Sequence, residues 1–157
     1  MWTLDPGGGP DGPSNLGDMK HKPQLANVMT SEPETVQVGQ PLSEVYTLLQ
    51  NRGFHHVPVL DGDLPVGMIS ATDILRLVYD VDSNDDRMLR TLLDHQFTLD
   101  DAMSTELITV QQGDELRKVV DYMASGSVHS VVVLGDDGVL AGIVTSSDLI
   151  RQLGELL

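Results

Sequence analysis

The chain has 157 residues, 40% of them hydrophobic, and nine Lys and Arg stand against 24 Asp and Glu, for a formal charge of −15. This length allows one ordinary domain or two very small ones. The charge disfavours DNA or RNA binding, because an acidic surface repels the phosphate backbone. Cysteine is absent, which excludes disulfides, thiolate catalysis and cysteine-ligated metals.

The sequence contains no apolar run near the roughly 20 residues that a membrane span needs, and no pattern typical of a signal peptide. We therefore expect a cytoplasmic protein that does not bind membranes. The acidity is typical of solubility or of a saline cell interior. Residues 1–18 are rich in Gly and Pro and are predicted to be a disordered tail.

A first unit is predicted over residues 19–81. It begins with a helical turn at 25–29 and a short strand at 35–38, and continues with a helix whose apolar residues stand at 42, 45, 48 and 49. Gly53 is expected to end that helix. Two strands, 54–60 and 66–69, then flank a tight turn at Asp61-Gly62-Asp63. Ser70 opens a closing helix with a buried stripe of Ile74, Leu77 and Val78.

Residues 82–97 are predicted to form a linker helix between two units. Ser83 or Asn84 is the expected N-cap, acidic residues follow in the first turn, and Leu89, Leu92 and Leu93 supply an apolar edge.

A second unit, residues 98–157, repeats the first. The segment Gly67-Met68-Ile69-Ser70-Ala71-Thr72-Asp73 returns as Gly142-Ile143-Val144-Thr145-Ser146-Ser147-Asp148, and His55 returns 74 positions later as His129. The buried helix stripes are expected to recur at Leu116, Val119, Val120 and Met123, and at Leu149, Ile150 and Leu153. A repeat that keeps its order over about 60 residues is a stronger signal than any single motif in it.

Each unit closes with a Ser/Thr-x-x-Asp motif, Ser70 to Asp73 and Thr145 to Asp148. This spacing is typical of a capping box, which needs no ligand. The same helix start gathers free backbone N–H groups and partial positive charge, so it can also hold a phosphate or a sugar hydroxyl. Both interpretations remain open, and they are compatible.

The motifs Val28-Met29-Thr30, His-x-Val-Pro-Val and Gly-x-x-Ser-x-x-Asp resemble the cystathionine-β-synthase (CBS) domain family, and two units in tandem resemble a Bateman module. The likeness covers residues 24–157. It implies an α/β (α+β) fold of two pseudo-two-fold-related units, each strand-helix-strand-strand-helix, with the sheets packed together and the helices outside. It also implies two clefts for AMP, ADP, ATP or S-adenosylmethionine, and a flat homodimer formed by the first and last helices of each unit.

By the same resemblance, Asp73 and Asp148 would receive ribose hydroxyls, and four hydroxyl residues would touch ribose or phosphate. His55 and His129 resemble phosphate-contacting histidines of the regulatory subunit of AMP-activated protein kinase, and each is expected near both clefts. The predicted ligand-binding residues are Met68, Ser70, Thr72, Asp73, Ile143, Thr145, Ser147, Asp148, His55 and His129.

Other residues near these motifs have alternative interpretations. Neighbours on a strand face opposite sides, so His56 is expected on the surface. Arg76 and Arg151 follow their aspartates by three residues, which favours ion pairs over phosphate contacts. Few basic residues flank either site, so a monophosphate or the cationic S-adenosylmethionine fits better than ATP. The second unit has Val132 where the first has Pro58, and we expect the two clefts to differ.

The sequence contains no nucleophile elbow, phosphate loop, zinc-protease pair or dinucleotide fingerprint. The five histidines lack zinc-ligand spacing, and Asp61/Asp63 and Asp136/Asp137 are explained by tight turns rather than by a cation. We therefore expect no catalysis, no catalytic cofactor and no metal. The predicted function is regulatory sensing of an adenosine-containing ligand on behalf of an unidentified partner protein. The alternative is a ligand-free dimerisation or protein-interaction module.

Overall fold

The computed structural model describes residues 23–51, 54–82 and 85–157. The predicted tail at 1–18, the helix end at Gly53 and the proposed caps Ser83 and Asn84 lie outside these ranges.

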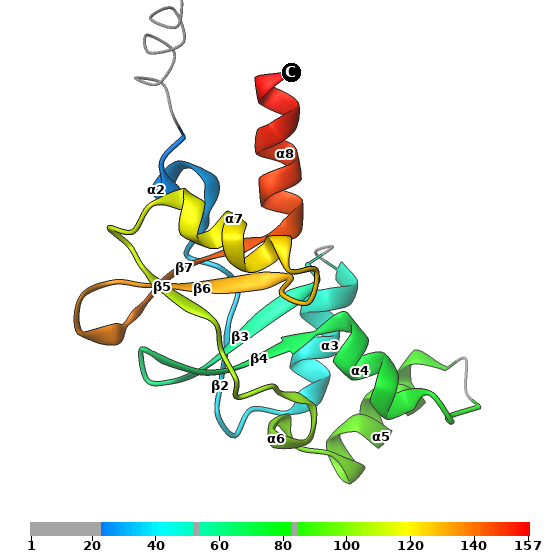
Figure 1. The fold of residues 1–157 in the computed structure, drawn as a ribbon. Coiled ribbons are helices and arrows are strands. Elements are labelled where there is room, and N and C mark those ends of the chain that lie inside the picture. The colour runs from blue at the N-terminus through cyan, green and yellow to red at the C-terminus, as the bar shows by residue number, and fades with distance from the viewer. Residues whose placement is uncertain (1–22, 52–53, 83–84) are drawn as a thin grey trace, which may run out of the picture.

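Two β-sheets face each other, and the helices lie on their outer sides (Figure 1). The first sheet has the order β2-β3-β4, and the second has the order β1-β7-β6-β5. The strands are β1 (Thr30–Ser31), β2 (Val36–Gln37), β3 (His56–Asp61), β4 (Leu64–Ser70), β5 (Thr109–Gln111), β6 (Ser130–Leu134) and β7 (Leu140–Thr145). The predicted α/β fold of two repeats is confirmed.

Each unit has the same pairing scheme. β2 pairs parallel with β3 and β3 antiparallel with β4, and β5, β6 and β7 repeat this pattern. The helices beside the first sheet are α3 (Leu42–Asn51), α4 (Ala71–Val78), α5 (Asp86–Gln96) and α6 (Leu99–Ala102). Those beside the second are α2 (Leu25–Val28), α7 (Leu116–Ala124) and α8 (Ser146–Leu156), and Asp136–Gly138 forms a short 3-10 turn.

Alternation along the central strands divides the apolar side chains among three clusters. Val57 and Val59 of β3 are fully buried in the first-unit core, under the helices. Val131 and Val133 of β6 are buried in the second-unit core. The opposite faces of the strands meet between the sheets, in a cluster built around Met68, Val132 and Ile143. This third cluster joins the two units.

The segments that begin the two units are exchanged in space. Leu25 and Val28 of α2 pack into the second-unit core, whereas Leu99 and Ala102 of α6 pack into the first-unit core. β1 extends the second sheet through its pairing with β7, and a single bridge joins Ser104 to Met68. Each core therefore contains residues from both halves of the sequence.

The exchange explains the glycine in each closing motif. A Cβ on Gly142 would lie 2.6 Å from the backbone oxygen of Thr30, and a Cβ on Gly67 would lie 2.6 Å from the sulfur of Met103. Both contacts come from the exchanged segments, so glycine lets them pass close to the strands.

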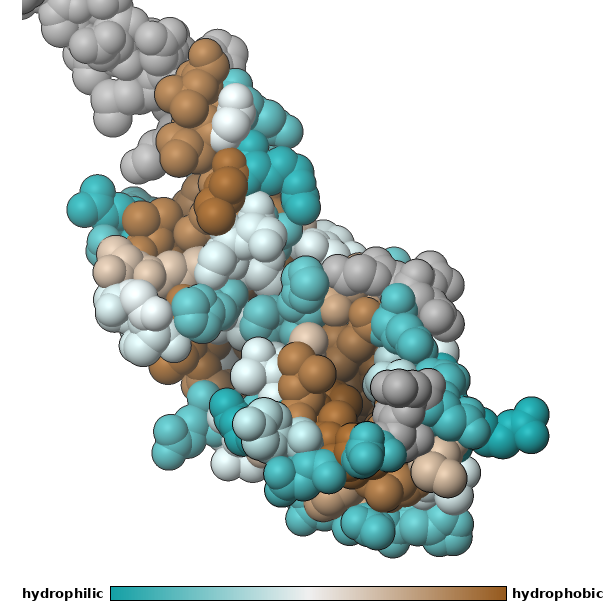
Figure 2. All heavy atoms as spheres, turned by 90° about the vertical axis from the view of Figure 1, so that its right-hand side faces the viewer, coloured by the Kyte–Doolittle hydropathy of each residue, from teal (hydrophilic) through white to brown (hydrophobic). Residues whose placement is uncertain are grey.

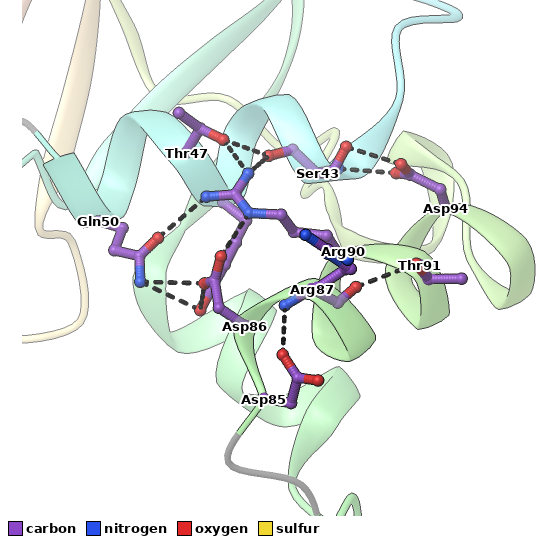
Figure 3. A network of polar contacts seen from close by, with 10 residues as sticks. Ser43, Thr47, Gln50, Asp85, Asp86, Arg87, Arg90, Thr91 and Asp94 are labelled. Atoms are coloured by element: carbon purple, nitrogen blue, oxygen red, sulfur yellow. Dashed lines mark hydrogen bonds and ion pairs between the residues drawn. The ribbon is translucent and has the colours of Figure 1, made fainter.

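The linker helix α5 is held against α3 by polar contacts, shown in Figure 3. Arg90 donates through Nε to Asp86 at 2.8 Å and through Nη2 to Gln50 at 3.1 Å; it also donates to Thr47, and its guanidinium lies 5.0 Å from the centre of the Tyr46 ring. The Arg90 and Tyr46 hydrogen bonds lower the pKa of Asp86.

Aspartates near the two ends of α5 cap helices. Asp94 caps the start of α3 by accepting bonds from the backbone N and Oγ of Ser43 at 2.9 and 2.7 Å. Asp85 caps α5 itself, since its carboxylate accepts from the backbone N of Arg87 at 3.0 Å. The predicted linker helix is present, and its cap is one residue later than Asn84. Leu93 is the fully buried member of its apolar edge.

Three residues of the predicted buried stripes are exposed instead. Val120 on α7 is 39% exposed, and Ile150 and Leu153 on α8 are 68% and 56% exposed. Leu149, in the first turn of α8, packs on the second-unit core. The rest of α8 runs on beyond the edge of the sheet (Figure 1), so periodicity alone could not assign it a buried face.

Candidate functional site

Two hollows lie between the units at positions related by the internal repeat. The larger, of about 490 Å³, is lined at the second closing motif by Ile143, Thr145, Ser147 and Asp148. It also contains His129 and, from the first unit, His55. We call it the large cleft. It brings together six of the predicted ligand-binding residues.

The smaller hollow, of about 260 Å³, lies at the first closing motif and is lined by Met68, Ser70 and Asp73 together with His129. We call it the small cleft. Thr72 is exposed on α4 and lines neither cleft, and His55 lines only the large one. The expectation that each histidine lies near both clefts therefore holds for His129 and is wrong for His55, because His55 precedes β3 on the side of the large cleft.

The closing motifs are complete capping boxes. Asp148 Oδ2 accepts from the backbone N and Oγ1 of Thr145 at 2.8 and 3.1 Å, while Thr145 Oγ1 accepts from the backbone N of Asp148 at 3.3 Å. Asp73 Oδ2 accepts from the backbone N and Oγ of Ser70 at 2.7 and 2.9 Å. The predicted caps are confirmed, and both carboxylates, that of Asp148 buried and that of Asp73 partly exposed, are fixed at the helix starts.

The second oxygen of each aspartate faces an arginine. Asp148 Oδ1 accepts from Arg151 at 3.2 Å, and Asp73 Oδ1 lies 3.5 Å from Arg76, which confirms the predicted ion pairs. The side chains of Arg76 and Arg151 are 74% and 69% exposed, so these ion pairs contribute little stability. A carboxylate has acceptor capacity for about four hydrogen bonds. Asp148 already accepts three, so it can accept one bond from a ribose diol, whereas Asp73 accepts two and can accept both.

The prediction that His56 lies on the surface is wrong. Its side chain is half-buried, lines both clefts, and has an Nδ1 atom that is buried without a hydrogen-bond partner. Burial lowers the pKa of His56, the nearby His55 and His129 lower it further, and Asp73 opposes them. His56 begins β3 opposite Ser70, and its presence in the lining of both clefts shows that its side chain faces the space between the units.

Sequence reasoning also missed the contributions of the exchanged segments. Thr30 and Glu34 line the large cleft, and Ser104 and Glu106 line the small one. These residues belong to the segments after α2 and α6, and nothing in their local pattern indicates that they cross to the other unit. The constant spacing of the repeat, which relates Thr30 to Ser104, was the available signal.

Across residues 23–51, 54–82 and 85–157, no group of three His, Asp or Glu side chains could hold a metal ion. Within the same ranges, no helix has both the length and the apolar character required to cross a bilayer. The groups that the clefts offer to a ligand are carboxylates, hydroxyls, imidazoles and helix-start N–H groups, a set that suits hydrogen bonding to a sugar and a small anion.

Comparison with known proteins gives a consistent result. The family profile described as "CBS domain" matches residues 25–80 and 99–155. A Methanocaldococcus jannaschii protein, MJ1225, is 25% identical over 114 residues, which are 72% of this chain and 41% of the relative. A homoserine O-acetyltransferase of Methanocorpusculum labreanum is 26% identical over 134 residues, 85% of this chain and 24% of the enzyme. The chain thus spans less than half of the length of these relatives.

Solved structures of CBS domain proteins have the same fold as this chain. A CBS domain-containing protein of Bacillus anthracis has a TM-score of 0.71 at 19% identity, covering 87% of this chain and 96% of that one. The CBS domain pair of MJ0100, in complex with 5′-methylthioadenosine and S-adenosylmethionine, has a TM-score of 0.69 at 20% identity, covering 86% and 98%. CBSX2 in complex with AMP has a TM-score of 0.68 at 20% identity, covering 85% and 97%.

Proposed function

The chain belongs to the CBS domain family as a tandem pair, and on that premise we propose that it is a regulatory module that binds an adenosine-containing ligand in one or both clefts. Binding changes the packing of the two units, and a partner protein responds to that change. The module itself performs no catalysis and acts in the cytoplasm. Such signalling requires that the ligand bind one arrangement of the units more tightly than another.

The observation that carries this proposal is the duplicated cleft. In each one, a carboxylate and a hydroxyl at a helix start face imidazoles contributed across the interface, as in Asp148 and Thr145 opposite His55. The carboxylate suits a ribose diol, and the imidazoles suit a phosphate. The complexes of MJ0100 and CBSX2 with adenosine compounds support the same ligand class.

The charges favour a small anion or a cation over a triphosphate. The basic side chains lining the large cleft are Arg151, already paired with Asp148, and three histidines, while Glu34 adds a negative charge. AMP or S-adenosylmethionine is therefore favoured over ADP and ATP.

Isothermal titration calorimetry with AMP, ADP, ATP, NAD and S-adenosylmethionine tests the proposal. We expect AMP or S-adenosylmethionine to bind, and His129→Ala to weaken AMP much more than adenosine. No heat from any of these compounds at millimolar concentration would refute ligand sensing.

A second candidate function, association without a ligand, is favoured by the exposed apolar side chains of the closing helices. Leu75 on α4 is 64% exposed, and Tyr79, which caps the end of α4, is 86% exposed. Ile150 and Leu153 on α8 are 68% and 56% exposed. Figure 2 shows apolar residues gathered on this side of the molecule, in an upper area at α8 and a lower area at the level of α4. Exposed apolar patches of this kind commonly mark a protein interface.

We propose that these surfaces pair two copies into a homodimer. α5 occupies one side of α3 through the Arg90 contacts, so α4, α7 and α8 are the helices that offer the interface. Light scattering at tens of micromolar should give twice the chain mass, and Ile150→Glu with Leu153→Glu should give the monomer. A wild-type monomer at that concentration would contradict the dimer.

A further inference from the structure

The two clefts share a wall made of imidazoles. His56 and His129 line both clefts. The position that the repeat relates to His56 is Ser130, 74 residues later, so the wall is not symmetric. Ser130 lines the small cleft and not the large one.

The remaining charged residues differ between the clefts. Two carboxylates line each cleft, and in the large cleft these are Asp148 and Glu34. The large cleft also has Arg151, which lies beside Asp148, and His55. The small cleft is lined by Asp73 and Glu106, and no Lys or Arg is among the described residues that line it. Arg76, which the repeat relates to Arg151, pairs with Asp73 at 3.5 Å but lies outside the lining.

We infer that the clefts take different ligands: the large cleft takes an adenosine compound with one phosphate, and the small cleft takes an adenosine compound that is uncharged or cationic. This inference rests on the proposed function, since it divides the adenosine ligand class between the two clefts.

Size and charge both support the division. The small cleft has about half the volume of the large one, 260 against 490 Å³, and falls just below the range of about 300–1,000 Å³ usual for ligand sites. A phosphate there would face Asp73 and Glu106, and no arginine is among the described residues that line this cleft. Like charges separated by several ångströms in a partly enclosed site weaken binding by about fivefold to tenfold each.

His56 in the shared wall does not supply the positive charge that a phosphate in the small cleft would need. Burial and the two neighbouring histidines lower the pKa of His56, which keeps its imidazole neutral near pH 7. A neutral imidazole has one N–H donor, so it can serve a phosphate in only one cleft at a time. The buried, unpartnered Nδ1 shows that the protein itself leaves this ring without a full set of partners.

Calorimetry at about 0.1 M salt with adenosine and AMP tests the inference on the full chain. We expect adenosine to occupy two sites, and AMP to bind one site tightly and the second only weakly. Protein with AMP in the tight site should bind one further equivalent of adenosine. Glu106→Gln should tighten the weak second AMP event about fivefold to tenfold. Glu32→Gln is the matched control, because the repeat relates Glu32 to Glu106 and Glu32 lines neither cleft.

Two equal AMP events in the wild type, no adenosine binding to protein with AMP in the tight site, or an unchanged second AMP event in Glu106→Gln would each overturn the inference and leave the proposed function standing. Absence of binding by both compounds at millimolar concentration would overturn the proposed function as well.

Discussion

Asp148→Asn separates a capping role from a ligand-binding role at the large cleft. Asp148 is 7% exposed and accepts two bonds from Thr145 and one from Arg151. Asparagine is nearly the same size and keeps one carbonyl oxygen that can accept from the backbone of Thr145. Asparagine lacks the negative charge that strengthens these bonds, and its NH2 group cannot accept a hydrogen bond where the second carboxylate oxygen did.

The stability cost follows from these contacts. A charge-assisted hydrogen bond is about twice as strong as a neutral one, which makes the loss at the cap about 1 kcal/mol. The ion pair with Arg151, whose side chain is 69% exposed, adds a few tenths of a kcal/mol. We expect Asp148→Asn to lower the free energy of unfolding by about 1–2 kcal/mol and the melting temperature by roughly 2–8 °C.

The assay pairs thermal melts followed by circular dichroism with AMP titration by calorimetry. Asp101→Asn is the matched control, since Thr98 and Asp101 form a third capping box, with 2.8 Å between the backbone N of Thr98 and Oδ2 of Asp101, that lines neither cleft. Both variants should lose stability, and only Asp148→Asn should lose the AMP event. Unchanged AMP affinity in Asp148→Asn would refute the assignment of the ribose to this carboxylate.

Gly142→Ala should lower the free energy of unfolding by about 3 kcal/mol, because the added methyl meets the rigid backbone of Thr30. Gly67→Ala should lower it by about 1 kcal/mol, because the methyl meets the flexible thioether of Met103. Equal losses of stability in urea titrations would contradict this. His56→Gln should reduce the dependence of stability on pH. The folded pKa of His56 is lowered, so its contribution is present in full above the unfolded value of about 6.5 and is lost as pH falls through the folded value; melts at pH 7.5 and 5.5 measure the difference from wild type. Arg90→Lys should lower the free energy of unfolding by about 1–2 kcal/mol and speed hydrogen exchange in α5. The control Arg117→Lys, in an exposed ion pair on α7, should change the free energy of unfolding by a few tenths of a kcal/mol. Unchanged hydrogen-exchange protection of α5 in Arg90→Lys would argue against the role of Arg90.

The repeat made most of the fold predictable. A spacing of 74 residues, which becomes 75 for the closing motifs and helices, relates whole elements to one another. The order of the elements along the chain, the closing helices and both capping boxes could therefore be located from the sequence. Local chemistry was also sufficient for Ser70 and Thr145, because an N-cap and its acidic partner lie within one turn and depend on no distant contact.

Sequence reasoning failed where the position of a residue depends on the other unit. His56 was assigned to the surface by strand alternation, yet the space on its side of the strand is closed by the second unit. Ile150 and Leu153 follow helical spacing as well as Leu149 does. They are exposed because α8 extends beyond the edge of the sheet that would cover them. Thr72 has the residue type expected of a ligand contact, and its place on the helix turns it away from the small cleft.

The exchanged segments also set the order in which the chain can fold during synthesis. The first-unit core includes Leu99 and Ala102, so it is incomplete until residue 102 has left the ribosome, well after its own strands have formed. α2 must wait longer still, because Val131 and Val144, which complete its packing site, are made more than a hundred residues later. Contacts of such sequence separation close late and slow folding. A single repeat expressed alone therefore lacks part of its core, and we expect the pair to unfold as one cooperative unit rather than as two independent halves.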